Sequence, residues 1–138
     1  MKLTMPIAAI ALAVPAFALA QSAPRDCANP QTQSAMDQCA GASFQKSDKK
    51  MNALYRQIEA RLTGDPHSTK RLIEAQRDWL RFRDAECNFQ ASGGDGGSVS
   101  PMVFSMCRDN LTQARSKDFE SYLHCQEGDL SCPVPAAR

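Results

Sequence analysis

Three proline residues mark the starts of three expected helices. Asn29-Pro30, Asp65-Pro66 and Ser100-Pro101 each place a helix-capping residue directly before a proline. The cap side chain accepts a hydrogen bond from a free backbone N–H, and proline lacks a donor at a position where none is needed. The prolines are 36 and 35 residues apart. This spacing predicts three helices of similar length joined by short turns.

Apolar residues recur at helical spacing after each of these starts, and Gly64 is expected to end the first helix. The expected apolar faces are Met36, Cys39, Phe44, Met51, Leu54, Tyr55, Ile58 and Leu62, then Leu72, Ile73, Trp79, Leu80 and Cys87, then Phe104, Cys107, Leu111, Ala114, Phe119 and Tyr122. No alternating stretch is long enough to predict a strand. The sequence therefore predicts a small all-α domain of three helices.

The segment before the third helix is too rich in glycine to be ordered by itself. This glycine-rich loop contains Ser92, Gly93, Gly94, Asp95, Gly96, Gly97 and Ser98. After Leu123 the chain continues into a tail that ends in Pro133-Val134-Pro135-Ala136-Ala137-Arg138. We expect the loop and the tail to be mobile, with the helical domain at 21–124 and the C-terminal tail at 125–138.

The first twenty residues have the layout of a secretory signal. Met1-Lys2 gives a basic start, an apolar run follows, and Ala18-Leu19-Ala20 gives the small residues of a cleavage site. The apolar run is shorter than the ~20 residues of a spanning helix. No cysteine stands at the cleavage point, so no lipid anchor is expected there. Residues 1–20 are therefore expected to be a signal peptide, and the mature protein to be periplasmic or secreted by a bacterium.

All six cysteines follow this signal: Cys27, Cys39, Cys87, Cys107, Cys125 and Cys132. An even number in an oxidising compartment predicts disulfides. Folding the second and third helices back about the glycine-rich loop brings Cys107 close to Cys87, and Cys125 and Cys132 bracket a short turn. Cys27 and Cys39 then remain, although a crossed pairing of the first four cysteines is an open alternative.

Charge and composition exclude several classes of function. The chain has 16 Lys and Arg against 15 Asp and Glu, so it has no general electrostatic attraction to nucleic acid or an anionic membrane. There is no C-x-x-C motif and there are only two histidines, so no metal or cofactor is expected. His67 and His124 are not evidently beside a nucleophile, and Glu74 and Glu86 are single carboxylates. We therefore expect no catalytic residues and no enzymatic activity.

Several polar residues share the helix faces that carry the apolar residues. An arginine that faces a core needs a carboxylate partner, and Asp48 and Asp84 are the candidates for Arg83 and Arg115. These residues form either a polar ligand site or a buried network that fixes the register of the helices, and we favour the network. Its expected members are Asp48, Asn52, Gln76, Arg83, Asp84, Thr112 and Arg115.

The same residues carry a resemblance to a known family. Asp48-x-x-Met51-Asn52-x-x-Tyr55, Gln76-x-x-Trp79-x-x-Phe82-Arg83-Asp84-x-x-Cys87 and Cys107-x-x-x-Leu111-Thr112-x-x-Arg115 resemble the signature of the LprI-like lysozyme-inhibitor domain family. The resemblance covers about residues 27–122, with methionine at position 51 where the family usually has leucine. It implies an exported helical domain, with lysozyme inhibition attributed to the family's namesake, a lipoprotein.

Two functions follow as hypotheses. The first is a binding protein that inhibits lysozyme-type muramidases. The alternative is a small envelope-stress or structural protein that binds another partner. An inhibitor needs a segment that enters a substrate cleft lined by acidic residues, and the glycine-rich loop allows close backbone approach. The loop is otherwise a simple connector, which we favour, and the exposed helix faces around Lys70, Arg77 and Arg81 are then the candidate binding surface.

Overall fold

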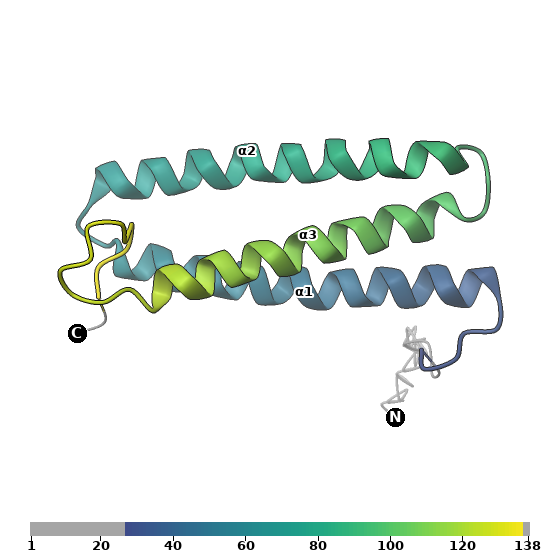
Figure 1. The fold of residues 1–138 in the computed structure, drawn as a ribbon, viewed down its shortest axis with the longest axis horizontal. Coiled ribbons are helices and arrows are strands. Elements are labelled where there is room, and N and C mark those ends of the chain that lie inside the picture. Colours follow the sequence, from purple (N-terminus) through teal and green to yellow (C-terminus); the bar gives the residue numbers. More distant parts are fainter. Residues whose placement is uncertain (1–26, 137–138) are drawn as a thin grey trace, which may run out of the picture.

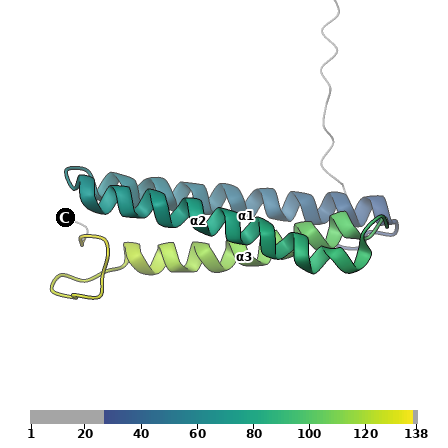
Figure 2. The same cartoon turned by 90° about the horizontal axis from the view of Figure 1, so that it is seen from above.

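The computed structural model describes residues 27–136 and contains three long helices. These are α1 (Gln33–Arg61), α2 (Pro66–Ala91) and α3 (Ser100–Leu123), with a short 3-10 helix η1 (Ser92–Gly94) between the last two. The described residues contain no strand. The helices run alternately up and down in an elongated bundle, and α3 packs along both α1 and α2 (Figures 1 and 2). The predicted all-α fold of three helices is confirmed, and the expected signal peptide lies outside the described residues.

The second helix starts as predicted, but the first does not. Oδ1 of Asp65 accepts a hydrogen bond from the backbone N–H of Ser68 at 3.0 Å, so Asp65 caps α2. The start of the first helix at Pro30 was wrong, because Thr32 caps α1 and accepts from the N–H of Ala35 at 3.1 Å. Threonine is also a good capping residue. This later start leaves residues 27–32 outside the helix, where they turn back towards it.

The third helix also starts differently from the prediction. It begins at Ser100 itself, after Val99, and its N-cap makes no side-chain hydrogen bond. Proline still occupies its first turn. The hydroxyl of Ser100 instead lies 3.5 Å from the carbonyl of Ala91, at the end of α2. Ser100 therefore contacts the end of the preceding helix instead of capping its own.

The hydrophobic core lies in the half of the bundle near the turn between α1 and α2. Its buried residues are Met51, Ile58, Leu62, Phe119, Leu123 and Val134. Most of the predicted apolar residues of α1 belong to this core or pack against it. In α3 the prediction was wrong at Ala114, which is exposed, because the buried face of this helix runs through Thr112, Ser116 and Phe119. Two of these residues are polar, so the apolar pattern did not reveal the face.

Three disulfides connect the cysteines in the described residues. They join Cys27 to Cys39, Cys87 to Cys107 and Cys125 to Cys132, and no cysteine is free. The spacing argument favoured these pairs. Disulfides of this number fit an oxidising compartment, where each typically stabilises a small domain by ~2–4 kcal/mol. None of the helices in residues 27–136 is long and apolar enough to cross a membrane.

The C-terminal tail folds back onto the bundle instead of extending away from it. Val134 is only 3% exposed and belongs to the core. Nη1 of Arg61 donates to the carbonyl of Leu123 at 2.6 Å, which ties the end of α3 to α1. The tail returns past the turn between α1 and α2 (yellow in Figure 1). Val134, within the expected C-terminal tail, therefore packs on the helical bundle.

Candidate functional site

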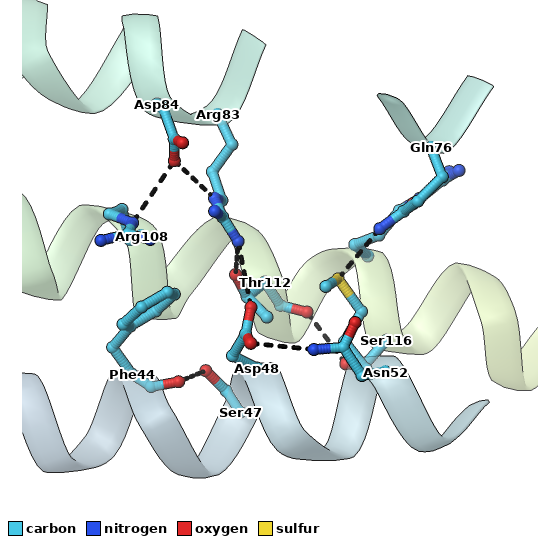
Figure 3. Close-up of polar contacts among 12 residues, drawn as sticks. Phe44, Ser47, Asp48, Asn52, Gln76, Arg83, Asp84, Arg108, Thr112 and Ser116 are labelled. Carbon is cyan, nitrogen blue, oxygen red and sulfur yellow. Dashed lines mark hydrogen bonds and ion pairs between the residues drawn. The ribbon is translucent and has the colours of Figure 1, made fainter. Parts of the chain in front are cut away.

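Arg83 is the centre of the polar network between the helices. It projects from α2 into the bundle and is only 4% exposed. Its Nε donates to Asp84 at 2.9 Å and its Nη1 donates to Asp48 on α1 at 3.3 Å (Figure 3). The same Nη1 lies 3.4 Å from Oγ1 of Thr112 on α3. One buried guanidinium thus contacts all three helices.

Polar and aromatic neighbours both stabilise the positive charge of Arg83 and orient its planar guanidinium group. Nδ2 of Asn52 donates to the second carboxylate oxygen of Asp48 at 2.9 Å, which orients Asp48 towards the arginine. The guanidinium carbon of Arg83 lies 5.3 Å from the ring centre of Phe44 and 5.4 Å from that of Trp79. A guanidinium over aromatic rings gains a cation–π attraction. Nε and Nη1 of Arg83 therefore both have hydrogen-bond partners, and two aromatic rings lie near its guanidinium.

Arg108 is a member of the network that the sequence analysis missed. Its Nε lies 3.4 Å from Asp84, and its guanidinium carbon stands 3.9 Å above the ring of Phe44. Burial and the neighbouring charge of Arg83 lower the pKa of Arg108, while Asp84 and Asp48 oppose this shift. The signal was present, because Arg108 precedes Thr112 by four residues and therefore lies on the same face of α3.

Gln76 and Arg115 form a second group of contacts, nearer the hydrophobic core. Nε of Arg115 donates to Oε1 of Gln76 at 3.2 Å, and Nε2 of Gln76 lies 3.5 Å from the sulfur of Met51. The expectation that Asp48 or Asp84 pairs with Arg115 was wrong. Arg115 instead lies 3.7 Å from Asp118, one turn further along α3. Its guanidinium also stands 4.5 Å from the ring of Phe119.

The seven residues expected to form the polar network thus form two neighbouring groups, in which Asn52 is exposed and the side chain of Asp84 is 48% exposed. Their hydrogen-bonding groups are largely used by one another, which supports a role in helix register over a role in ligand binding. His67 and His124 lie outside both groups, and Nδ1 of His124 is 2.6 Å from the carbonyl of Glu120. No cluster of three or more His, Cys, Asp or Glu side chains in the described part of the chain is arranged to hold a metal ion.

The glycine-rich loop is a compact series of turns, contrary to the expectation that it has no structure of its own. Ser92 begins the short helix η1 and its hydroxyl donates to the carbonyl of Phe89 at 2.7 Å. Backbone N–H groups of Asp95 and Gly97 donate to carbonyls three residues earlier, at 3.1 and 2.8 Å. Gly96 has φ +76°, a conformation that favours glycine. The loop thus has a defined backbone path.

The loop forms one end of the molecule, where the chain turns from α2 to α3 (Figure 1). The Cys87–Cys107 disulfide joins the two helices, five residues before the loop on α2 and nine residues after it on α3. Its residues are exposed apart from the half-buried Gly94. Two apolar side chains flank it in the sequence, with Phe89 75% exposed and Val99 41% exposed. We call residues 92–98 with Phe89 and Val99 the loop-end surface.

Comparison with known proteins gives one family and one relative. The family model described as "Lysozyme inhibitor LprI" matches residues 25–119. An uncharacterized protein of Rhizobium meliloti (strain 1021) is 28% identical over an alignment of 138 positions, and the alignment covers 92% of this chain and 99% of that protein. No solved structure matches the chain. The matched residues include all three helices up to Phe119, together with the glycine-rich loop.

Proposed function

Because the chain belongs to the LprI family of lysozyme inhibitors, we propose that it is an exported protein that binds and inhibits lysozyme-type muramidases. The family match supports this proposal most directly. The three disulfides support export, since such bonds persist in oxidising compartments.

The loop-end surface is the contact region that we propose for the enzyme. The single observation that carries it is an exposed glycine-rich turn held by a disulfide at its base. A binding segment that is ordered before it binds loses less conformational entropy on association. Phe89, 75% exposed, supplies the apolar area that typically anchors an interface. Glycines at the tip allow the backbone to approach the walls of a cleft.

The negative charge of the loop leads to a specific prediction for this proposal. Asp95 is exposed at the loop, and glycoside hydrolases carry a pair of acidic residues at the reaction centre. Like charges repel at short distance. If the loop enters the cleft, Asp95→Asn is therefore expected to strengthen inhibition, most clearly at low ionic strength, where screening is weak.

The experiment is an inhibition assay with purified residues 21–138 and a muramidase acting on cell-wall substrate. Phe89→Ala is expected to weaken inhibition about tenfold or more, which is typical of an interface anchor. Phe82→Ala is the matched control, because Phe82 lies on the same helix, is 54% exposed and is two turns before Phe89. If both variants inhibit like the parent, the loop is only a connector, and the surface around Lys70, Arg77 and Arg81 becomes the next candidate.

The alternative is an envelope-stress or structural protein with another partner. A folded, fully oxidised protein that leaves muramidases uninhibited at high micromolar concentration would favour this alternative. We also propose that residues 1–20 are removed on export and that the mature helical domain begins at Gln21. An intact-mass measurement of the exported protein tests this cleavage site, and a retained Met1 would contradict it.

A further inference from the structure

A pocket of about 370 Å³ lies between the three helices and the returning tail, near the turn between α1 and α2. Its apolar walls are Ile58, Leu62, Leu72, Tyr122 and Val134. Ile58, Leu62 and Val134 are buried, whereas Leu72 and Tyr122 are partly buried. Small-molecule sites in proteins typically have volumes of ~300–1,000 Å³ and mostly apolar walls. This pocket has the size and lining of such a site.

The polar residues of the pocket are positively charged or neutral. Arg71 and Arg115 both line it, together with the hydroxyl-bearing Ser68. Arg71 is exposed and has no ion pair among the described residues. Arg115 has one carboxylate near it, Asp118 at 3.7 Å, whose side chain is 56% exposed. No acidic residue lines the pocket itself. The site therefore combines apolar walls with an excess of positive charge.

We propose that this pocket binds a single-chain fatty acid. The acyl chain would lie against Leu72 and Tyr122, over the buried Ile58, Leu62 and Val134, and the carboxylate would pair with Arg71 at the exposed side. Arginine is suited to this contact because its planar group donates two parallel hydrogen bonds to a carboxylate. Arg115 adds positive charge to the same pocket. A neutral or cationic amphiphile would lack this contact, so the charge of the pocket selects an anionic head group.

The pocket is separate from the loop-end surface. The pocket is bounded by the tail and lies at one end of the bundle, and the glycine-rich loop lies at the other end (Figure 1). Fatty-acid binding goes beyond the proposed inhibition of muramidases and does not depend on it. It is measured with no muramidase present, so either proposal can fail while the other stands.

The test is calorimetric titration of the full mature protein, residues 21–138, with dodecanoate below its micelle concentration. The expected result is saturable binding of one dodecanoate per chain. Dodecyl maltoside and dodecyltrimethylammonium have the same chain length with neutral and cationic heads, and both are expected to bind at least tenfold more weakly. Absence of saturable dodecanoate binding, or equal binding of the three amphiphiles, would overturn the proposal.

Two substitutions in the pocket test whether the fatty acid binds there. Arg71→Gln is expected to weaken dodecanoate binding about tenfold, as loss of one ion-paired contact typically does. Arg77→Gln, another exposed arginine of α2 that does not line the pocket, is expected to bind like the parent. Ala75 is exposed at the rim, so Ala75→Phe should block entry while the melting temperature stays near that of the parent. Parent-like binding by both Arg71→Gln and Ala75→Phe would refute the assignment.

Discussion

Arg83 on α2 and Asp48 on α1 face each other across the bundle, with Nη1 of the arginine 3.3 Å from Oδ1 of the aspartate. The side chain of Arg83 is 5% exposed and that of Asp48 is 34% exposed, so the pair is buried on one side and reaches solvent on the other. Both α1 and α2 pack mainly against α3. This ion pair is therefore one of the few direct side-chain connections between α1 and α2, together with the contact of Gln76 with Met51.

Replacing Arg83 by methionine is expected to lower the free energy of unfolding by about 3 kcal/mol, because it leaves Asp48 without its cationic partner and Asp84 with Arg108 alone. Urea unfolding followed by circular dichroism measures this loss. The control is Arg81→Met, since Arg81 is 70% exposed and its pair with Asp78 typically contributes less than ~1 kcal/mol. A parent-like midpoint for Arg83→Met would show that the network does not stabilise the fold.

Trp79→Ala is expected to impair folding and to leave the binding surface intact. Trp79 packs against the core, and its ring lies 5.4 Å from the guanidinium of Arg83 and 5.8 Å from that of Arg115. Truncation of a packed aromatic typically costs ~3–5 kcal/mol, and the lower value applies here because Trp79 is only partly buried. Thermal melting measures the loss, and Trp79→Phe should retain most of the stability. An unchanged melt with loss of muramidase binding would instead make Trp79 a contact residue.

The tail offers a matched pair of substitutions. Val134→Ala removes two buried methyl groups and is expected to cost roughly 1.5 kcal/mol, at ~0.8 kcal/mol for each. Leu130→Ala, within the loop closed by Cys125 and Cys132, should leave stability unchanged because Leu130 is fully exposed. Denaturant unfolding under oxidising conditions compares the two variants. Equal midpoints would show that the tail does not pack on the bundle in solution.

Acid is expected to destabilise the protein. The backbone N–H of Ser68 lowers the pKa of Asp65. Burial raises the pKa of Asp109, but hydrogen bonds from neighbouring side chains, including Ser43 at 2.7 Å, lower it by more. Carboxyls with lowered pKa values stabilise the native state above their unfolded pKa of ~4, and this contribution is lost as the pH falls through the folded pKa.

The melting temperature should therefore fall between about pH 5 and pH 3 and change less between about pH 7 and pH 5. Asp65→Asn provides the control, since asparagine is an equally good cap and does not titrate. Its melting temperature should fall less steeply over the acidic range than that of the parent. A melting temperature of the parent that rises on acidification would contradict the direction of these pKa shifts.

The sequence predicted the helices because their signals are local. Asp65-Pro66 is a cap and a first turn within two residues, and the structure uses it as predicted. The first helix was predicted one turn too early because Thr32 caps as well as Asn29 does. Between two good caps three residues apart, the choice depends on tertiary contacts, and here the chain before Gln33 turns back to bring Cys27 to Cys39.

The sequence predicted residues that belong to the polar network, but it did not predict which of them pair with one another. Helical spacing places Arg83 and Arg115 on inward faces, yet the carboxylate that each one meets depends on how far the helices slide past one another. Arg115 consequently pairs with Asp118 on its own helix. Val134 is buried because the tail folds back on the bundle after the turn closed by Cys125 and Cys132. No periodicity in the sequence predicts that the tail folds back in this way.

The Cys87–Cys107 disulfide encloses the whole glycine-rich loop within one covalent ring. A protease that cuts any peptide bond between residues 92 and 98 would therefore leave both fragments attached, with α2 and α3 still packed against each other. Cleaved protein would migrate as a single species on a non-reducing gel and separate into two fragments only after reduction. Cleavage within this exposed segment therefore does not release either half of the molecule.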